Sequence, residues 1–157
     1  MIKQVRAVCF TGHRNFPIME TGKIIHAVEC LILQGYNRFY SGGAYGFDLA
    51  AAQSVIYLKR KYPQTELFLI LPCEKEKQTH GWSERNKKLY EYVLAEADHV
   101  SVLQEEAFCM QKRNQALVDA ASCCLCWYQP VRERSGTGQT VRMAERKQIQ
   151  ILNLYLW

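Results

Sequence analysis

Three short segments carry glycines and hydroxyl side chains, and the first also carries basic side chains; these are the residue types that bind phosphate. They are residues 11–14 (TGHR), 41–48 (SGGAYGFD) and 135–140 (SGTGQT). Glycines ahead of a helix let backbone N–H groups approach a ligand, and a helix start carries about half a positive charge. Together these features make an anion site. A tight strand-to-helix turn also needs glycine for steric reasons, but two Gly-rich segments with hydroxyl side chains, together with the basic TGHR turn, predict a phosphate-bearing ligand.

A carboxylate stands inside the second segment, where it would repel a phosphate bound to the same turn. Asp48 has two interpretations. Either it favours the helix dipole as an acid in a first turn, or it accepts hydrogen bonds from ribose hydroxyls, as the acidic residue of a dinucleotide fold does. The second interpretation predicts a nucleotide rather than bare phosphate.

Four further residues are weaker candidates. Arg113 and Asn114 lie near the middle of a predicted helix, with Asp119 one and a half turns later. Arg113 is either a ligand contact or a solvated helix charge. Trp82 either stacks on a base at the rim of a cleft or covers the core.

Strands that alternate with helices must position these segments. Apolar, β-branched or aromatic runs predict strands over residues 5–10, 38–40, 66–71, 99–103, 122–128 and 149–155. Helical spacing of apolar residues predicts helices between an N-cap at Thr21 and a stop at Gly35, over 47–60, from a cap at Ser83 to about 97, over 105–121 and over 139–147. Residues 73–81 are polar and show no period.

This alternation requires right-handed crossovers and a mostly parallel sheet. We therefore predict an α/β fold: a three-layer, Rossmann-like domain with about six strands and helices on both faces. Ligands in such sheets bind outside the carboxyl ends of the strands, near the point where strand order reverses. All three segments follow predicted strands, so we expect them to meet at that edge.

Length and composition agree with one soluble domain over residues 1–157. The chain is 48% hydrophobic with a formal charge of +5, and it has no repeat, linker or composition shift. This excludes an intrinsically disordered protein, and the longest apolar runs are too short to cross a membrane. No separate signal segment is seen, so we expect a cytoplasmic protein without a membrane partner. The basic clusters are interleaved with acids on predicted helices, which argues against a nucleic-acid partner.

Seven cysteines form neither a disulfide framework nor a metal site. Most lie inside apolar runs, so we expect them to be reduced. Cys123 and Cys126 form a CxxC, but in a strand their thiols point to opposite faces. The four histidines show no metal-ligand spacing. We therefore predict no metal.

In their joint order, these motifs resemble the YpsA-like branch of the SLOG superfamily, which also contains the LOG phosphoribohydrolases and the DprA Rossmann domain. The resemblance rests on TGHR, SGGAYGFDLAAA, residues 78–82, KRNQALVD (112–119) and SGTGQT, and so covers nearly the whole chain. Members of the branch are bacterial. The resemblance implies a Rossmann-like domain that binds a nucleotide or nucleotide-derived ligand, such as ADP-ribose, and requires no cofactor.

The resemblance also implies contacts from the first segment (Thr11, Gly12, Arg14), the second (Gly42, Gly43, Gly46, Asp48) and the third (Gly136, Thr137). The residue types alone add Ser41, Trp82, Arg113, Asn114 and Thr140. Related Rossmann-like domains often pair through helices, so a homodimer is the association that we expect if the chain self-associates.

The sequence departs from the phosphoribohydrolase pattern at a position that bears on catalysis. That branch carries Gly-Thr-x-x-Glu, whereas Thr140 stands here in place of the acid. Cleaving an N-glycosidic bond needs a carboxylate beside the anomeric carbon, and only Asp48 and Asp119 are candidates. We therefore rank binding or sensing of a nucleotide first. A nucleoside or nucleotide hydrolase or transferase that uses Asp48 is second, and a DprA-like nucleic-acid module is third.

Overall fold

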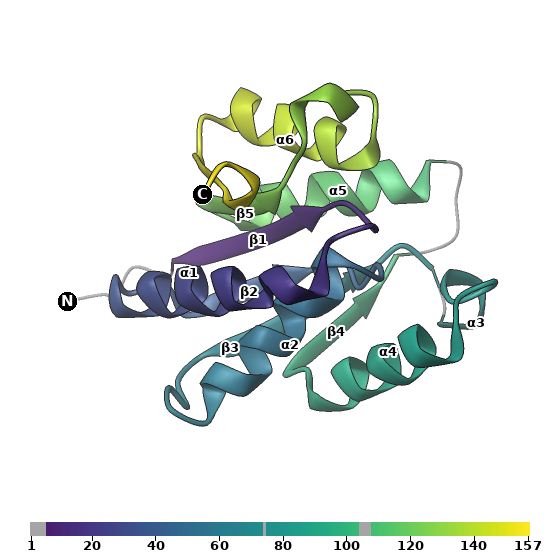
Figure 1. Ribbon diagram of the computed structural model, residues 1–157, viewed down its shortest axis with the longest axis horizontal. Helices are drawn as coiled ribbons and strands as arrows, with labels where there is room; N and C mark the ends of the chain where they lie inside the picture. The colour runs from purple at the N-terminus through teal and green to yellow at the C-terminus, as the bar shows by residue number, and fades with distance from the viewer. Residues whose placement is uncertain (1–5, 74, 104–107) are drawn as a thin grey trace.

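Six parallel strands form one sheet in the computed structural model, which describes residues 6–73, 75–103 and 108–157 (Figure 1). The order across the sheet is β4-β3-β2-β1-β5-β6. The bounds are β1 (Ala7–Gly12), β2 (Arg38–Ser41), β3 (Glu66–Leu71), β4 (His99–Val102), β5 (Cys123–Trp127) and β6 (Gln150–Asn153). From β1 to β4 the chain moves outward in one direction, and β5 and β6 lie on the other side of β1. The strand order therefore reverses between β1 and β5.

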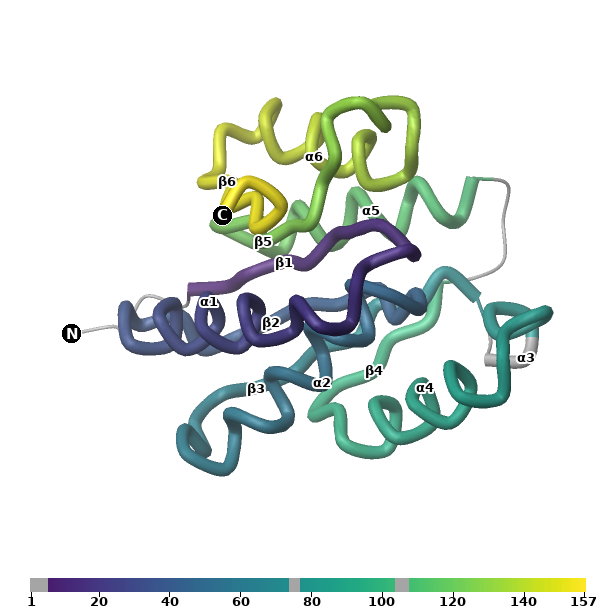
Figure 2. Tube along the Cα trace, in the orientation of Figure 1, coloured from purple at the N-terminus to yellow at the C-terminus, as the bar shows by residue number. Residues whose placement is uncertain are grey.

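Helices cover both faces of the sheet. They are α1 (Thr21–Leu33), α2 (Phe47–Lys59), α3 (Lys75–Gln78), α4 (Glu84–Glu96), α5 (Cys109–Ala120) and α6 (Gly136–Lys147). Helices α1, α2 and α4 lie on one face of the sheet, and α5 and α6 lie on the other (Figure 2). Their apolar side chains form a separate core on each face. The predicted three-layer, Rossmann-like fold is confirmed. None of the helices in the described ranges is long and apolar enough to span a bilayer.

The two faces have different cores. Phe10, Phe39 and Phe47 contribute to a large aromatic core under α1 and α2. The smaller core under α5 and α6 contains cysteines of β1 and β5. Cys123 packs in the first core and Cys126 in the second, so the prediction that their side chains point to opposite faces is confirmed. All seven cysteines are unbridged, and burial raises the pKa of the Cys123 thiol to about 12.

Most predicted element boundaries hold to within a few residues, and the capping side chains explain several of them. Ser83 caps α4 as predicted, because its hydroxyl accepts the amide of Asn86 at 3.2 Å. Gly35, with φ +103°, follows the end of α1 as predicted. The cap predicted at Thr21 is wrong: Thr21 is the first residue of α1, and its hydroxyl donates to the carbonyl of Ile18 at 2.6 Å.

Two elements differ from prediction. α6 begins at Gly136, three residues before the predicted start, because Ser135 caps it. Residues 73–81 contain α3, which at four residues is too short to show a hydrophobic period. The first residue of the predicted strand at 5–10 and the beginning of the predicted helix at 105–121 lie outside the described residues.

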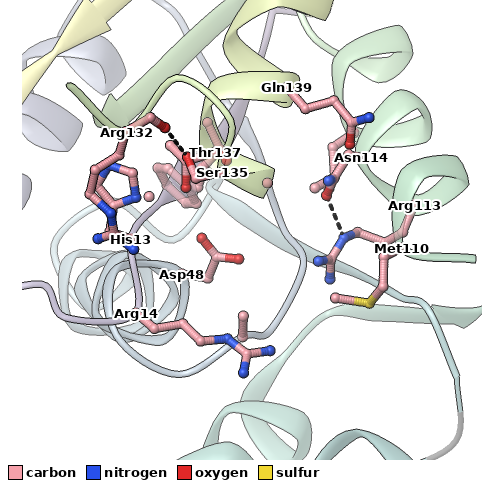
Figure 3. Close-up of a pocket in the computed structure, with 16 residues that line it drawn as sticks. His13, Arg14, Asp48, Met110, Arg113, Asn114, Arg132, Ser135, Thr137 and Gln139 are labelled. Carbon is pink, nitrogen blue, oxygen red and sulfur yellow. Dashed lines mark hydrogen bonds between the residues drawn. The ribbon is translucent and has the colours of Figure 1, made fainter. Parts of the chain in front are cut away.

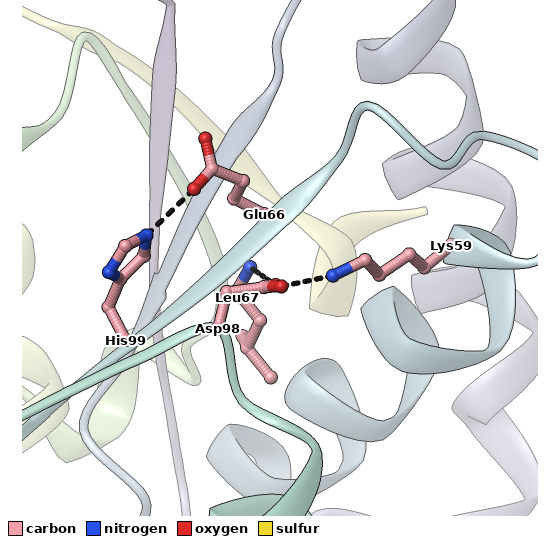
Figure 4. A network of polar contacts seen from close by, with 5 residues as sticks. All are labelled: Lys59, Glu66, Leu67, Asp98 and His99. Carbon is pink, nitrogen blue, oxygen red and sulfur yellow. Dashed lines mark hydrogen bonds and ion pairs between the residues drawn. The ribbon is translucent and has the colours of Figure 1, made fainter.

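A polar network joins β4 to β3 at the edge where these strands begin (Figure 4). The Asp98 carboxylate accepts hydrogen bonds from Lys59 Nζ and, at 2.8 Å, from the amide of Leu67. Burial alone would raise the pKa of Asp98, but these two donors hold it below its usual value. His99 Nε2 lies 2.7 Å from the carboxylate of Glu66. This network stabilises the outer strand at the edge remote from the carboxyl ends.

Candidate functional site

A cavity of about 280 Å³ lies beyond the carboxyl end of β1, at the reversal of strand order (Figure 3). We call it the first cavity. Its walls come from the segment after β1, the start of α2, the helix α5, and the loop between β5 and α6. Eight of the predicted residues line it: Thr11, Gly12, Arg14, Asp48, Arg113, Asn114, Gly136 and Thr137. Residues of all three segments therefore lie together at one edge of the sheet, as expected.

The start of α6 presents open backbone donors to this cavity. Ser135 is the N-cap, and its hydroxyl accepts the amide of Gly138 at 3.0 Å. The first two amides of an α-helix have no acceptor within the helix, which leaves those of Gly136 and Thr137 facing a ligand. Both residues line the cavity, and α6 is twelve residues long. The aligned peptide dipoles favour an anion here.

Three arginines add positive charge around the same space. Arg14, Arg113 and Arg132 line the cavity. Arg132 donates to Asn15 Oδ1 at 3.0 Å, and the Arg14 guanidinium lies over the ring of Tyr45, 4.7 Å from its centroid. Guanidinium groups bind phosphate and carboxylate oxygens through two parallel N–H bonds. The cavity therefore suits an anionic ligand.

Asp48 is the one carboxylate among the described residues that line the first cavity. Its side chain points into the space between Arg14, Arg113 and the start of α6 (Figure 3). The residue is 7% exposed, and Oδ1 has no hydrogen-bond partner within the described chain. Burial raises the pKa of Asp48 to about 6, although Arg113, Arg14 and the backbone amides of Ala44 and Gly12 oppose the rise. A buried acceptor without a protein partner is satisfied by an ordered water or by a donor from a ligand.

Arg113 is buried rather than solvated. It is 4% exposed, donating from Nη1 to the carbonyl of Gly42 at 2.6 Å and from Nε to Asn114 Oδ1 at 2.8 Å. Desolvation lowers the pKa of Arg113, while the charge of Asp48 raises it. A Cβ atom at Gly42 would overlap the guanidinium, which is the physical reason for a glycine there. Arg113 thus fixes the loop after β2 to α5 beside the cavity.

The other predicted residues of the second segment shape the loop instead of lining the first cavity. The Ser41 hydroxyl donates to the backbone carbonyl of Asp48 at 3.1 Å and accepts the amide of Gly43 at 3.2 Å. Gly43 has φ +75° and Gly46 has φ +89°, and a Cβ at Gly46 would overlap the carbonyl of Arg14. These residues hold Asp48 and the start of α2 in place.

Three predicted candidates lie away from the first cavity. The Thr140 hydroxyl donates to the carbonyl of Gly136 at 3.0 Å, one turn back in α6. Trp82 is 8% exposed and packs edge-on against Tyr45 and Tyr90, with ring centroids 5.1 and 5.4 Å apart, which agrees with the core interpretation. Asp119 accepts a hydrogen bond from Gln115 at 2.8 Å near the end of α5.

His13 and Arg132 line the first cavity but were not predicted as site residues. His13 Nε2 accepts the amide of Gln129 at 3.0 Å, which links the loops after β1 and β5. Burial and the charge of Arg132 lower the pKa of His13 to about 4, so the imidazole is neutral at pH 7. The sequence could have indicated His13, because it lies inside the TGHR segment. Arg132 lies in the loop between β5 and α6, and no local sequence pattern indicates that this loop reaches the cavity.

No group of three His, Cys, Asp or Glu side chains within residues 6–73, 75–103 and 108–157 is arranged to hold a metal ion. The ligand-binding features of the first cavity are therefore backbone amides, guanidinium groups and one carboxylate.

Comparison with protein families identifies the chain. The family model described as YspA SLOG family (YpsA) matches residues 8–156. The chain belongs to this family. The match spans β1 to the end of the described sheet, so it includes all three segments of the first cavity. The resemblance predicted from the motifs is confirmed.

Relatives and a solved structure agree with membership of the YspA SLOG family. A UPF0398 protein of Bacillus thuringiensis (strain Al Hakam) is 23% identical over 96% of this chain and 88% of its own length. A UPF0398 protein of Bacillus cereus (strain AH820) is 22% identical over the same shares. DNA processing protein A from Helicobacter pylori, solved for its single-stranded DNA binding mode, superposes with a TM-score of 0.65 at 18% identity. That alignment covers 93% of this chain and 63% of the other, and it shows a shared fold.

Proposed function

We propose that this member of the YspA SLOG family binds a phosphorylated nucleoside in the first cavity. The phosphate accepts hydrogen bonds from the amides of Gly136 and Thr137, and the ribose hydroxyls donate to Asp48. The observation that carries the proposal is that the Asp48 carboxylate and the two open amides at the start of α6 line one cavity. The Asp48 carboxylate accepts hydrogen bonds from donors, and the open amides of α6 favour an anion. A sugar phosphate supplies both.

The placement of Asp48 removes the conflict between a carboxylate and a bound phosphate. Asp48 belongs to the first turn of α2, whereas the open amides belong to α6. The amide of Phe47, the first of α2, already donates to the carbonyl of His13 at 3.3 Å. The phosphate therefore binds at α6, and the carboxylate is left for the sugar.

Binding without turnover fits the chemistry of the cavity better than hydrolysis. Cleavage of a glycosidic bond uses two carboxylates in defined positions. Asp48 is the single acid that lines the described part of the cavity, and the side chain of Thr140 is turned into α6. A nucleotide hydrolase or transferase would need Asp48 to act alone. Its activity would appear as release of free base, and Asp48→Asn would abolish it.

A melting experiment tests the proposal. The purified chain is heated with and without AMP, ADP-ribose or NAD. A ligand at 100 times its dissociation constant adds about 2.7 kcal/mol to stability, which raises the melting temperature by about 5 to 10 °C in a chain of this size. We expect at least one of the three ligands to produce such a shift. If none of them moves the transition, the proposed function is wrong.

The role of Asp48 is tested by comparing AMP with 2′-deoxy-AMP. Removal of one ribose hydroxyl is expected to weaken binding to the native chain by about tenfold, the cost of leaving a buried acceptor unpaired. Asp48→Asn keeps the shape of the side chain but removes its charge, and this variant is expected to discriminate less between the two nucleotides. Equal discrimination by both proteins would exclude the ribose contact.

Single-stranded DNA is a second candidate ligand. The Helicobacter pylori protein with the same fold is described by its single-stranded DNA binding mode, and this chain carries a formal charge of +5. Binding through phosphate contacts would weaken steeply with salt, because each contact releases counterions. An oligonucleotide titration at two salt concentrations therefore separates the candidates: a steep salt slope favours DNA, and a shallow slope with tight AMP binding favours the nucleotide.

A further inference from the structure

A second cavity, of about 590 Å³, adjoins the first one. Arg14 lines both. The second cavity lies over the starts of α1, α2 and α4, whereas the first lies at the starts of α2 and α6. Its volume is within the range of roughly 300–1,000 Å³ typical of small-molecule sites. None of the predicted contacts from the sequence except Arg14 and Gly46 borders it.

The lining of the second cavity suits a nucleobase. Tyr45 supplies an aromatic surface, and Gln53 and Asn86 supply amide groups that both donate and accept hydrogen bonds. Base-edge atoms are donors and acceptors of the same kind, and base rings stack on aromatic side chains. Tyr45 is fixed by its edge-on contact with the buried Trp82.

The charge of the second cavity suits a ligand that also carries phosphate. Arg14 and Arg85 line it, and no carboxylate stands among its described lining residues. Arg14 is held at the boundary between the cavities: its guanidinium lies over the Tyr45 ring, and its backbone packs against Gly46 so closely that a Cβ there would overlap it. A guanidinium at a boundary is placed to bind a phosphate that passes from one cavity to the other.

We infer that the ligand spans both cavities and consists of two nucleosides joined through phosphate. One nucleoside occupies the first cavity, the linking phosphate lies at Arg14, and the second base lies beside Tyr45, Gln53 and Asn86. This inference rests on the proposed function, because the first nucleoside uses Asp48 and the start of α6. A free dinucleotide and two adjacent ribonucleotides of a single strand share this chemistry.

Calorimetric titrations test the inference with three probes: AMP, NAD and the 5′-phosphorylated adenosine ribodinucleotide, each of which keeps a ribose hydroxyl for Asp48. AMP fills the first cavity alone, NAD joins its nucleosides by a diphosphate, and the ribodinucleotide joins them by one phosphate as in a strand. We expect NAD or the ribodinucleotide to bind about tenfold or more tightly than AMP, because it adds contacts in the second cavity. The probe with the larger gain identifies the source of the ligand.

The variant that isolates the second cavity is the double substitution Gln53→Ala and Arg85→Ala. Both side chains are exposed, and neither lines the first cavity. The double variant is expected to lose the advantage of the two-nucleoside probe while its affinity for AMP stays within about twofold of the native value. Arg60→Ala is the matched control for the charge change, because Arg60 is exposed at the end of α2 and lines neither cavity. It is expected to change none of the affinities.

Two results would overturn the inference. If AMP binds as tightly as both larger probes, or if the double variant keeps the advantage, the second cavity takes no part in binding, while the function proposed for the first cavity stands. If AMP and both larger probes fail to bind the native chain, the proposed function itself is wrong and the inference falls with it.

Discussion

Asp48 combines burial, one carboxylate oxygen without a protein partner and a position beside two arginines. A structural acid at a helix start is normally exposed or fully hydrogen-bonded, because a buried charge without partners costs stability. Burial of this carboxylate lowers the stability of the folded chain, and the raised pKa of Asp48 reflects that cost. Such a cost is typical of binding and catalytic sites, where local stability is given up for function.

This cost predicts a pH dependence of stability. The folded pKa of Asp48 is about 6, above the ordinary value of 3.8. The contribution of Asp48 to stability is therefore largest below about pH 4 and is lost as the pH rises through 6. Asp48→Asn removes this titration. Between pH 4 and pH 7, we expect the variant to gain about 2 to 3 kcal/mol in unfolding free energy relative to the native chain.

Urea unfolding of both proteins at the two pH values measures this difference. Other carboxylates with shifted pKa, such as Asp98, are present in both proteins and cancel in the comparison. A difference between native and variant that is the same at pH 4 and pH 7 would contradict the account of Asp48.

Arg113 is predicted to be structural as well as a cavity residue. Arg113→Ala removes the donors to Gly42 and Asn114 and leaves Asp48 without its nearest buried counter-charge. Breaking a buried charged network of this kind costs about 2 to 4 kcal/mol. Arg113→Lys is expected to recover part of the loss, since an ammonium group cannot reproduce the fork of the guanidinium. Urea unfolding at pH 7 measures both; a loss below about 0.5 kcal/mol for Arg113→Ala would contradict this role.

At the scale of elements, the start of α6 carries the proposed anion site, and its geometry depends on Gly138. A Cβ atom there would overlap the carbonyl of Glu133, so the loop before α6 must move and Ser135 loses its capping position. We expect Gly138→Ala to cost about 1 to 3 kcal/mol of stability and to weaken AMP binding by about tenfold.

The control for this substitution is Gly22→Ala in α1. A Cβ atom at Gly22 meets nothing within 4 Å, so alanine there is expected to stabilise the chain by about 0.5 to 1 kcal/mol without changing AMP affinity. Thermal unfolding and calorimetry of the two variants decide the matter. Equal stability and equal AMP affinity of the two variants would show that the close contact between Gly138 and Glu133 does not affect the site.

The elements themselves were largely predictable, because apolar runs and helical periods are local signals. β3 occupies the predicted residues 66–71, and α2 ends within one residue of prediction. The start of α6 was not predicted, because Ser135 is followed by two glycines within three residues, and such a segment looks like continued loop. The hydroxyl of Thr140 was expected to face a ligand, but its orientation is set by a bond within α6.

At the scale of the whole molecule, alternation and crossover handedness predict a parallel sheet, and parallel strands bring the three segments to one edge. Which side chains then face the cavity depends on tertiary packing. Arg113 is buried because α5 packs over the sheet beside Gly42, and no spacing within α5 indicates this. The second cavity arises where the starts of α1, α2 and α4 approach each other, which is likewise invisible in the sequence.

The central claim, that amides of α6 and the carboxylate of Asp48 hold one phosphorylated sugar, is tested most directly by an NMR titration of the isotope-labelled chain with AMP. Backbone amide resonances report binding residue by residue. The account predicts that the largest shifts fall on Gly12, Gly136 and Thr137, with small shifts at the opposite edge around Leu67. Largest shifts elsewhere on the molecule, or no shifts at millimolar AMP, would contradict it.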